Sequence, residues 1–229
     1  MNPIKTALLS YGMSGEIFHA PLLAVDPNFS LTTILQRNSD KAKSRYPDIR
    51  IVRKIEDIMK DDSIELVVIN TPNESHFEYA TLALEAGKHM IVEKPFTVNV
   101  QDADRLINLA IKKNRVLTVF QNRRWDGDFM TVKKLIENRS LGKLVEFELH
   151  YDRYRNYIEE NTWKEQEGPG TGILYNLGSH MLDQVLVLFG LPLFLDARLA
   201  IKRPSGQVHD YYDIRLEYKD FHVILKSSY

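Results

Sequence analysis

The sequence predicts an α/β protein whose first half holds a parallel sheet and whose second half is an α+β region with a mostly antiparallel sheet. Two observations carry this prediction. Up to about residue 122, short apolar runs alternate with longer amphipathic segments, which is typical of βαβ units with helices on both faces of a parallel sheet. Beyond it, runs such as 145–149 alternate apolar and polar residues, which indicates strands with one covered face. We therefore divide the chain into residues 1–122 and 123–229.

The first region contains strand-like runs separated by helix-like segments. The strand-like runs are 4–10, 31–36, 49–52, 65–70, 89–93 and 116–121, of which 49–52 is the weakest. The helix-like segments are 16–25, 40–46, 55–60, 75–86 and 100–113. In the segment 75–86, apolar residues recur at helical spacing, and Gly87 follows as a typical C-terminal stop.

The second region begins with a helix and ends in strands. We expect helices at 129–138 and 179–189 and strands at 144–154, 194–201, 212–218 and 222–226, with a polar loop before residue 172. The last strand has no closing helix, so we expect an incomplete domain whose final strand is an exposed edge. Because an exposed edge invites pairing with another chain, we expect a homodimer or higher homo-oligomer through this sheet.

Composition excludes several classes of protein. The 229 residues include 30 basic and 31 acidic side chains, so no basic surplus points to nucleic acid or to an anionic membrane. There is no cysteine, which excludes disulfides, thiolate metal sites and a cysteine nucleophile. We find no apolar run long enough to span a membrane and no signal peptide, and we expect a cytoplasmic protein.

A glycine-rich turn follows the first strand-like run. It reads Ser10-Tyr11-Gly12-Met13-Ser14-Gly15, the G-x-G-x-x-G pattern with serine in place of the first glycine. Gly12 would let backbone amides approach a pyrophosphate, Gly15 would permit close helix–strand packing, and the helix N-terminus favours phosphate. A plain strand-to-helix turn can carry the same pattern. The βαβ series around it favours a Rossmann domain that binds a dinucleotide through Gly12, Met13, Ser14 and Gly15.

The end of the second strand bears on the choice between NAD and NADP. In dinucleotide-binding domains an acidic residue there binds the ribose 2′-hydroxyl, whereas an arginine accommodates a 2′-phosphate. This chain has no carboxylate there before Asp40, and Arg37 is available. We therefore expect NADP to be preferred over NAD, with plain solvated surface as the alternative role of Arg37.

Three sequence blocks carry a resemblance to a known family. They are residues 71–76, residues 83–95, which end in Glu93-Lys94-Pro95, and residues 172–184; the segments 12–21 and 121–126 fit the same pattern. In order and spacing they resemble the Gfo/Idh/MocA family of oxidoreductases, closest to its scyllo-inositol dehydrogenase-like branch. The resemblance implies NAD(P)-dependent hydride transfer between the nicotinamide and a hydroxyl or carbonyl group of a polyol, inositol or sugar. Members of that family are considerably longer, so this chain looks C-terminally short.

The resemblance also implies which residues contact the cofactor. In addition to the glycine-rich turn and Arg37, these are Thr71, Pro72, Asn73, His76, Glu93, Lys94, Arg124 and Trp125. Some have a structural alternative. His76 would equally suit a helix N-terminus, Asn73 a turn, and Trp125 a buried position at a domain junction.

The chemistry requires a group that takes the hydroxyl proton as hydride leaves the carbon. Lys94 follows a parallel strand, at the edge where open α/β sheets bind ligands, although a surface lysine could stand there as well. The resemblance assigns the acid–base role to His180, for which simple helix packing is the alternative. It places Asn176 where the family commonly has an aspartate, and a neutral amide cannot stabilise an imidazolium. On a helix, Asn176, His180 and Asp183 would share one face.

Other functions remain open at this point. Asn176, Ser10 and the short C-terminal part favour a dinucleotide-binding protein without catalysis. A Rossmann-type domain for another nucleotide is a third reading, against which the Glu93-Lys94-Pro95 block argues. We expect no metal site, because no further His or carboxylate cluster accompanies His180 and Asp183. The aromatic and basic residues from 151 to 163 fit strand packing or a polyol-facing loop better than nucleic acid, and we expect the loop 154–172 to decide the substrate.

Overall fold

A computed structural model describes residues 2–160 and 162–229 and divides into two compact units, one up to Phe120 and the other from Gln121 onward. The first unit holds a six-stranded, fully parallel sheet. Its strands are β1 (Ile4–Leu8), β2 (Phe29–Leu35), β3 (Arg50–Val52), β4 (Leu66–Ile69), β5 (His89–Val92) and β6 (Leu117–Val119). The strand order is β3-β2-β1-β4-β5-β6, the doubly wound Rossmann order. The predicted parallel α/β fold is confirmed, including the weak run at 49–52.

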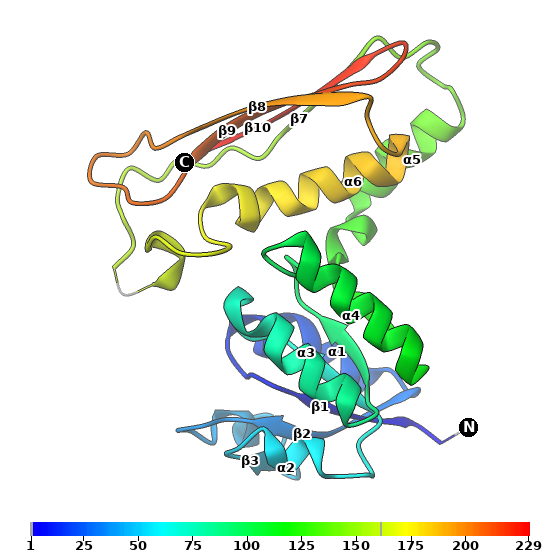
Figure 1. Cartoon of the computed structure of the whole chain (residues 1–229), viewed down its shortest axis with the longest axis vertical. Helices are drawn as coiled ribbons and strands as arrows, with labels where there is room; N and C mark the ends of the chain where they lie inside the picture. The colour runs from blue at the N-terminus through cyan, green and yellow to red at the C-terminus, as the bar shows by residue number, and fades with distance from the viewer. Residues whose placement is uncertain (1, 161) are drawn as a thin grey trace. The chain divides into compact units, whose positions relative to one another are not determined.

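Helices cover both faces of this sheet (Figure 1). They are α1 (Ala20–Val25), α2 (Glu56–Met59), α3 (His76–Glu85) and α4 (Val100–Lys113). Helices α3 and α4 bury Ala83 and Leu106 against one face, with Val67 of β4 in the same cluster. On the other face, Ala20 of α1 packs in a cluster with Leu8 and further strand residues. The sheet therefore lies between two apolar layers, and its strands read as near-continuous apolar runs for that reason.

Two predicted helices of this unit differ in the structure. The segment predicted at 40–46 is only a 3₁₀ turn, Lys41–Ser44, because Tyr46 precedes a proline and that position disfavours the helical conformation. The helix predicted from residue 16 opens with a π-helical turn, Gly15–His19, before α1. Pro21 lacks the N–H that an uninterrupted α-helix would need there, so the wider turn ends where the proline takes an early position of α1.

The second unit is an α+β domain. Its elements are η4 (Asn122–Trp125), α5 (Gly127–Glu137), β7 (Glu146–His150), η5 (Trp163–Glu165), η6 (Leu174–Gly178), α6 (Ser179–Phe189), β8 (Phe194–Ala200), β9 (Tyr211–Glu217) and β10 (His222–Ser228). The sheet order is β7-β10-β9-β8, with β7–β10 parallel and the other two pairs antiparallel. The expected mostly antiparallel sheet is confirmed. The expectation that the final strand is an exposed edge is wrong, because β10 lies between β7 and β9 and the edges of this sheet are β7 and β8.

Helix α6 lies along one face of this sheet, as Figure 1 shows. Met181 and Val185 of α6 pack with Ile214, Leu216 and Val223 of the strands in one buried cluster. The alternation seen in the sequence follows from this arrangement, because inward residues of β9 contact α6 and the residues between them face away. Among the described residues, no helix combines the length and apolar character that a membrane span requires.

Candidate functional site

The glycine-rich turn follows β1 and is held from the next strand over. A Cβ on Gly15 would lie 2.3 Å from the Ser10 carbonyl oxygen and 2.8 Å from Asn70 Nδ2, so only glycine fits this approach of helix to strand. Asn70, which follows β4, donates from Nδ2 to the Ser10 carbonyl at 2.9 Å. The Ser10 hydroxyl accepts from the Gly12 N–H at 3.2 Å. The serine at the first glycine position therefore closes the turn with its own side chain, while Gly12 and Met13 stay exposed.

The turn stands at the point where the winding of the sheet reverses. Strand β1 has β2 on one side and β4 on the other, and the chain crosses from one half of the sheet to the other between β3 and β4. Open α/β sheets bind ligands outside the carboxyl ends of the strands at such a switch point. Thr71, Pro72 and Asn73 follow β4 directly at this edge. The exposed turn, the helix behind it and the obligatory Gly15 fit the pyrophosphate of a dinucleotide.

A buried contact between a histidine and a carboxylate joins the helix behind the turn to the end of β5. His19 Nε2 lies 2.9 Å from Glu93 Oε1, and the two side chains are 3% and 13% exposed. Burial by itself raises the pKa of the Glu93 carboxyl, but the hydrogen bond and charge of His19, together with the Lys94 N–H, outweigh it and lower that pKa. The ring of His19 also packs on Phe120, with centroids 4.2 Å apart. The sequence did not predict this role of His19. The signal that could have indicated it is the position of His19 just before Ala20 and Pro21, where the helix starts.

Lys94 lies two residues beyond the last residue of β5 and is half-buried, which is the strand-end position expected for it. The Lys94–Pro95 peptide bond is cis. His76 is fully buried, with Nδ1 2.9 Å from the Pro95 carbonyl oxygen and Nε2 3.0 Å from that of Thr71. Both neighbours are acceptors, and a neutral imidazole has one N–H, which it donates to one of them at a time. His76 thus connects the loops after β4 and β5, and its assignment as a cofactor contact stays a prediction.

The end of β2 carries the residues that bear on the cofactor's ribose. Arg37 is exposed, and its Nη2 donates to the Tyr79 hydroxyl at 2.8 Å. Asp40, the first carboxylate after β2, pairs with Arg53 at 2.8 Å. Asp40, the next carboxylate in sequence after Arg37, is therefore balanced by Arg53. Arg37 itself is hydrogen-bonded to a neutral group, the Tyr79 hydroxyl.

The predicted residues of the second unit have separate partners. Asn176 lies in the π-helical turn η6, and its Nδ2 donates to the Tyr229 hydroxyl at 3.3 Å. His180 is buried in the first turn of α6. Asp183 accepts two hydrogen bonds from Arg124, at 2.6 and 2.7 Å. Asn176 lies in η6 whereas His180 and Asp183 lie in α6, so the expectation that the three share one helical face stays a prediction.

The neighbourhood of Arg124 joins η4 to α6. Gln184 of α6 donates from Nε2 to the Arg123 carbonyl at 3.0 Å, which adds to the two-point contact between Arg124 and Asp183. Trp125, next along, is 76% exposed and so is not buried within its own unit. The proposed cofactor contacts of Arg124 and Trp125 stay predictions.

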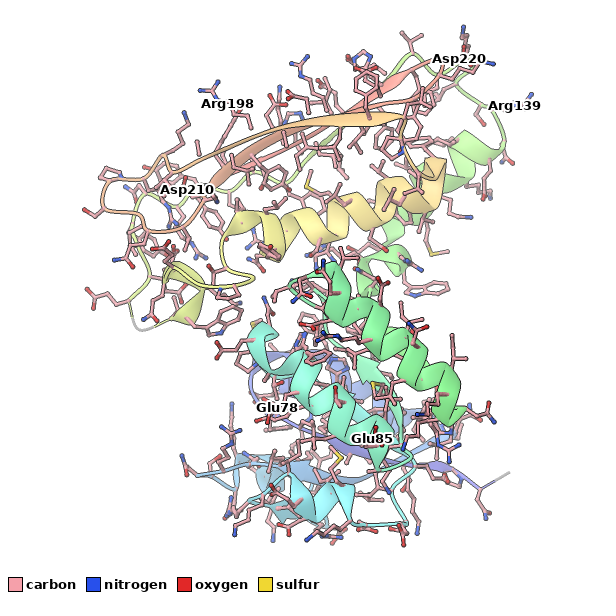
Figure 2. The ribbon with its side chains drawn as sticks, in the orientation of Figure 1. Glu78, Glu85, Arg139, Arg198, Asp210 and Asp220 are labelled. Atoms are coloured by element: carbon pink, nitrogen blue, oxygen red, sulfur yellow. The ribbon has the colours of Figure 1, made fainter. Side chains whose placement is uncertain are left out.

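A buried cluster of charged side chains anchors the polar loop, and no sequence pattern predicted it. Arg203, 4% exposed, binds both oxygens of Glu165, at 2.7 and 3.0 Å, and donates from Nε to Asp210 at 2.9 Å. Asp210, labelled in Figure 2, also accepts from the backbone N–H groups of Lys202 and Arg203. The Arg203 guanidinium lies 4.8 Å above the ring of Tyr229, the residue that contacts Asn176. The cluster therefore anchors the loop that carries Glu165 and orients Tyr229.

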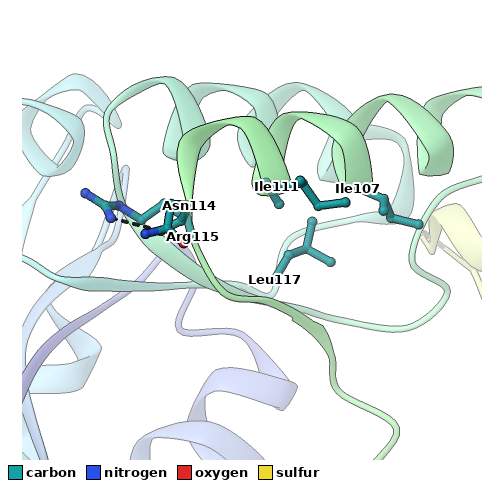
Figure 3. A pocket seen from close by; sticks show the side chains of 6 residues that line it. Ile107, Ile111, Asn114, Arg115 and Leu117 are labelled. Carbon is teal, nitrogen blue, oxygen red and sulfur yellow. Dashed lines mark hydrogen bonds between the residues drawn. The ribbon is translucent and has the colours of Figure 1, made fainter.

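A pocket of about 390 Å³ lies elsewhere, between the end of α4 and the start of β6 (Figure 3). Its lining consists of Ile107, Ala110, Ile111, Asn114, Arg115 and Leu117. Leu117 is the first residue of β6, so the pocket is at the amino end of the sheet and contains none of the predicted site residues. Within the described parts of the chain, no group of three or more His, Asp or Glu side chains is arranged to hold a metal ion.

The fold and this edge define a dinucleotide-binding protein of the Rossmann class. Residues 4–121 match the oxidoreductase family with an NAD-binding Rossmann fold, and residues 129–229 match the GFO/IDH/MocA C-terminal domain. The chain therefore belongs to the Gfo/Idh/MocA oxidoreductase family, as its sequence blocks predicted.

Individual relatives agree along almost the whole chain. The uncharacterized oxidoreductase YdgJ of Escherichia coli is 45% identical over 98% of this chain and 65% of its own length. The scyllo-inositol 2-dehydrogenase (NADP(+)) IolW of Bacillus subtilis is 39% identical over 98% of this chain and 63% of its own length. The solved structure of YvaA from Bacillus subtilis superposes with a TM-score of 0.95 at 38% identity, covering 99% of this chain and 65% of that one. The chain thus spans a little under two thirds of the length of these relatives.

Proposed function

We propose that this chain carries the machinery of an NAD(P)-dependent oxidoreductase that transfers a hydride between a nicotinamide and a hydroxyl or carbonyl group of a polyol, inositol or sugar. The observation that carries the proposal is the His19–Glu93 contact at 2.9 Å, which ties the helix behind the glycine-rich turn to the residue next to Lys94. Dinucleotide binding and the lysine thus share one edge of the sheet. The relative IolW, a scyllo-inositol 2-dehydrogenase, supports the substrate class.

In this reaction the chain itself binds and orients the substrate and the cofactor, and it moves a proton. The nicotinamide, when bound, supplies the hydride or accepts it. Oxidation of an alcohol releases the hydroxyl proton, which a side chain takes, and reduction returns it to the forming alkoxide. An ammonium donates hydrogen bonds but accepts none, so Lys94 suits the role of holding the substrate oxygen. An imidazole takes and returns a proton near neutral pH, so we assign that role to His180, with Asn176 as a neutral neighbour in sequence.

We further propose that NADP is preferred over NAD. Two features support this preference. Arg37 follows the end of β2, where an arginine accommodates the 2′-phosphate, and the Asp40 carboxylate is engaged by Arg53 at 2.8 Å. An arginine fork also matches phosphate geometry better than a point charge does. The relative IolW is named for NADP.

Two measurements on the purified chain test these proposals. Isothermal titration with NADPH and NADH should show binding of both nucleotides, with NADPH tighter. Reduction of NADP⁺ by a panel of inositols and sugars should then give turnover, which His180→Gln lowers on the order of 10²–10⁴-fold while NADPH affinity stays unchanged. His150→Gln, an exposed histidine of the same unit, is the matched control. Absence of nucleotide binding would refute the dinucleotide assignment, and full activity of His180→Gln would refute its role.

A dinucleotide-binding protein without catalysis is the second candidate, and Asn176 favours it. The amide is hydrogen-bonded to the Tyr229 hydroxyl at 3.3 Å and carries no charge that could balance an imidazolium. This candidate predicts nucleotide binding without turnover in the wild type. It also predicts that Asn176→Asp gains measurable activity, whereas equal turnover of both chains would exclude it.

We propose that the chain associates with itself through the second sheet. Strand β8 pairs with β9 alone among the described strands, and its residues from Phe194 to Leu199 are exposed. Phe194 and Leu195 are 65% and 62% exposed, and an apolar edge of this kind favours strand pairing. Sedimentation equilibrium at micromolar concentration should find a homodimer or higher oligomer that Leu195→Lys dissociates. A monomeric wild type would refute the proposal.

A further inference from the structure

The loop that joins β2 to the 3₁₀ turn is fixed from inside the first unit. Gln36 is 6% exposed; its Nε2 donates to the Ser39 hydroxyl at 2.7 Å, and its Oε1 accepts from the Ala42 N–H at 3.0 Å. Arg53 donates to the carbonyl oxygens of Gln36 and Ser39 at 2.6 and 2.5 Å. The loop backbone is thus held at both ends before any ligand binds. Arg37 follows Gln36 directly and points its side chain to the exposed side.

Among the described residues, Arg37 makes a hydrogen bond to Tyr79 that reaches across the edge of the sheet. Tyr79 belongs to α3, the helix after β4, and its ring packs against the apolar core of the first unit. Its hydroxyl emerges from that layer and accepts from Arg37 Nη2 at 2.8 Å. Since β2 and β4 flank β1, the two residues approach each other from the two sides of the glycine-rich turn. The side chain of the exposed Arg37 is thereby held by a partly buried tyrosine.

The phenol is suited to more than holding the arginine. A hydroxyl that accepts one hydrogen bond still carries its own proton, so the Tyr79 oxygen can accept from Arg37 and donate to a phosphate oxygen at once. The guanidinium keeps its other N–H groups for the same phosphate. Hydrogen bonds to a charged phosphate are stronger than those to a neutral ribose hydroxyl. Arg37 and Tyr79 together therefore suit discrimination of a 2′-phosphate from a 2′-hydroxyl.

We propose that Tyr79 is a specificity-determining residue for the adenosine 2′-phosphate, acting with Arg37 as one binding unit. The inference rests on the proposed preference for NADP and deepens it. Helical periodicity in the segment 75–86 places the ring of Tyr79 on the apolar face but does not show where its hydroxyl lies. A tyrosine that merely filled space would lose nothing in phosphate recognition when replaced by phenylalanine.

The test is a set of binding titrations on the full chain, without any turnover. Tyr79→Phe keeps the ring in the core and removes only the hydroxyl. We expect it to weaken NADPH and the fragment 2′,5′-ADP about tenfold, the loss typical of one hydrogen bond to a charged group, while NADH and 5′-AMP are unchanged. Tyr46→Phe is the matched control, because its buried hydroxyl has no hydrogen-bond partner among the described residues. Equal thermal midpoints for both variants and the wild type would show that folding is intact.

A double-mutant cycle with Arg37→Gln separates the outcomes. If Tyr79 acts with Arg37, the double variant binds 2′,5′-ADP much more tightly than the product of the two single losses predicts. If Tyr79→Phe weakens 2′,5′-ADP and 5′-AMP alike, or neither, the inference is overturned while the role of Arg37 stands. If the wild type prefers neither 2′,5′-ADP nor NADPH, the proposed NADP preference fails, and the inference with it. Titration of the wild type therefore tests the proposed NADP preference, and titration of the variants tests this inference separately.

Discussion

Replacing Arg203 by methionine would leave two carboxylates buried without their counter-charge. Glu165 and Asp210 have side chains only 6% and 0% exposed, and both pair with this arginine. Removing one partner of such a buried pair costs about 3–5 kcal/mol, because the remaining charge can be neither hydrated nor compensated. Asp210 keeps two backbone N–H donors, at 2.6 and 2.9 Å, whereas Glu165 keeps the more distant Arg155, whose Nη1 is 3.9 Å from Oε1, so Glu165 bears most of the loss. We therefore expect the free energy of unfolding to fall by about 4 kcal/mol at pH 7.

The assay is urea unfolding followed by tryptophan fluorescence. Both tryptophans of the chain, Trp125 and Trp163, belong to the unit that starts at Gln121, so the signal reports on the unit that contains Arg203. Arg198→Met is the matched control, because Arg198 is an exposed residue of β8 and the same change there should cost less than about 0.5 kcal/mol. Figure 2 labels Arg198 on the second sheet.

The pH dependence gives a second check with a defined sign. Burial raises the pKa of the Asp210 carboxyl, but the backbone N–H groups and the Arg203 guanidinium outweigh it and lower that pKa below its usual value. A carboxyl whose folded pKa is depressed stabilises the fold above its unfolded pKa of about 4 and loses that contribution as the pH falls through the folded value. Without Arg203 the depression shrinks, so the gap between wild type and variant should narrow as the pH falls from about 5 through the folded pKa of Asp210. A variant as stable as Arg198→Met, or a gap that does not depend on pH, would refute this reasoning.

Three further outcomes follow from the site geometry. Gly15→Ala places a Cβ 2.3 Å from a backbone oxygen and should lower the free energy of unfolding by about 1–3 kcal/mol. Gly12→Ala has 3.5 Å to its nearest neighbour, so it should leave stability unchanged and weaken NADPH binding in a titration. In a carbon-13 NMR titration, the Glu93 carboxyl should have a pKa below its usual value, and His19→Gln should raise it; no change would contradict the ion pair. Arg124→Lys loses the two-point contact and should cost about 1 kcal/mol in urea unfolding, with unchanged NADPH affinity if the arginine only joins η4 to α6.

Much of the first unit was readable from local patterns. Strands such as β4, buried on both faces, appear as short apolar runs, and their alternation with amphipathic segments predicts a parallel sheet. Gly15 was predicted for close packing because no side chain fits there, and the structure shows the contact. Lys94 was placed at a strand end by the run before it and the proline after it. Each of these signals lies within a few residues of the feature it predicts.

Only the tertiary structure decided which residues pair over long distances in the sequence. His19 and Glu93 are 74 positions apart, Arg37 and Tyr79 are 42 apart, and both contacts exist because the winding of the sheet brings their strand ends together. Arg203 reaches back to Glu165 across 38 positions. Hydrophobic periodicity reports which face of an element is buried, but a polar partner is chosen by register, loop path and packing. The sequence by itself therefore determined the fold class, the glycine-rich turn and the strand-end lysine, and the tertiary structure determined which charges meet, because that depends on distances no local pattern encodes.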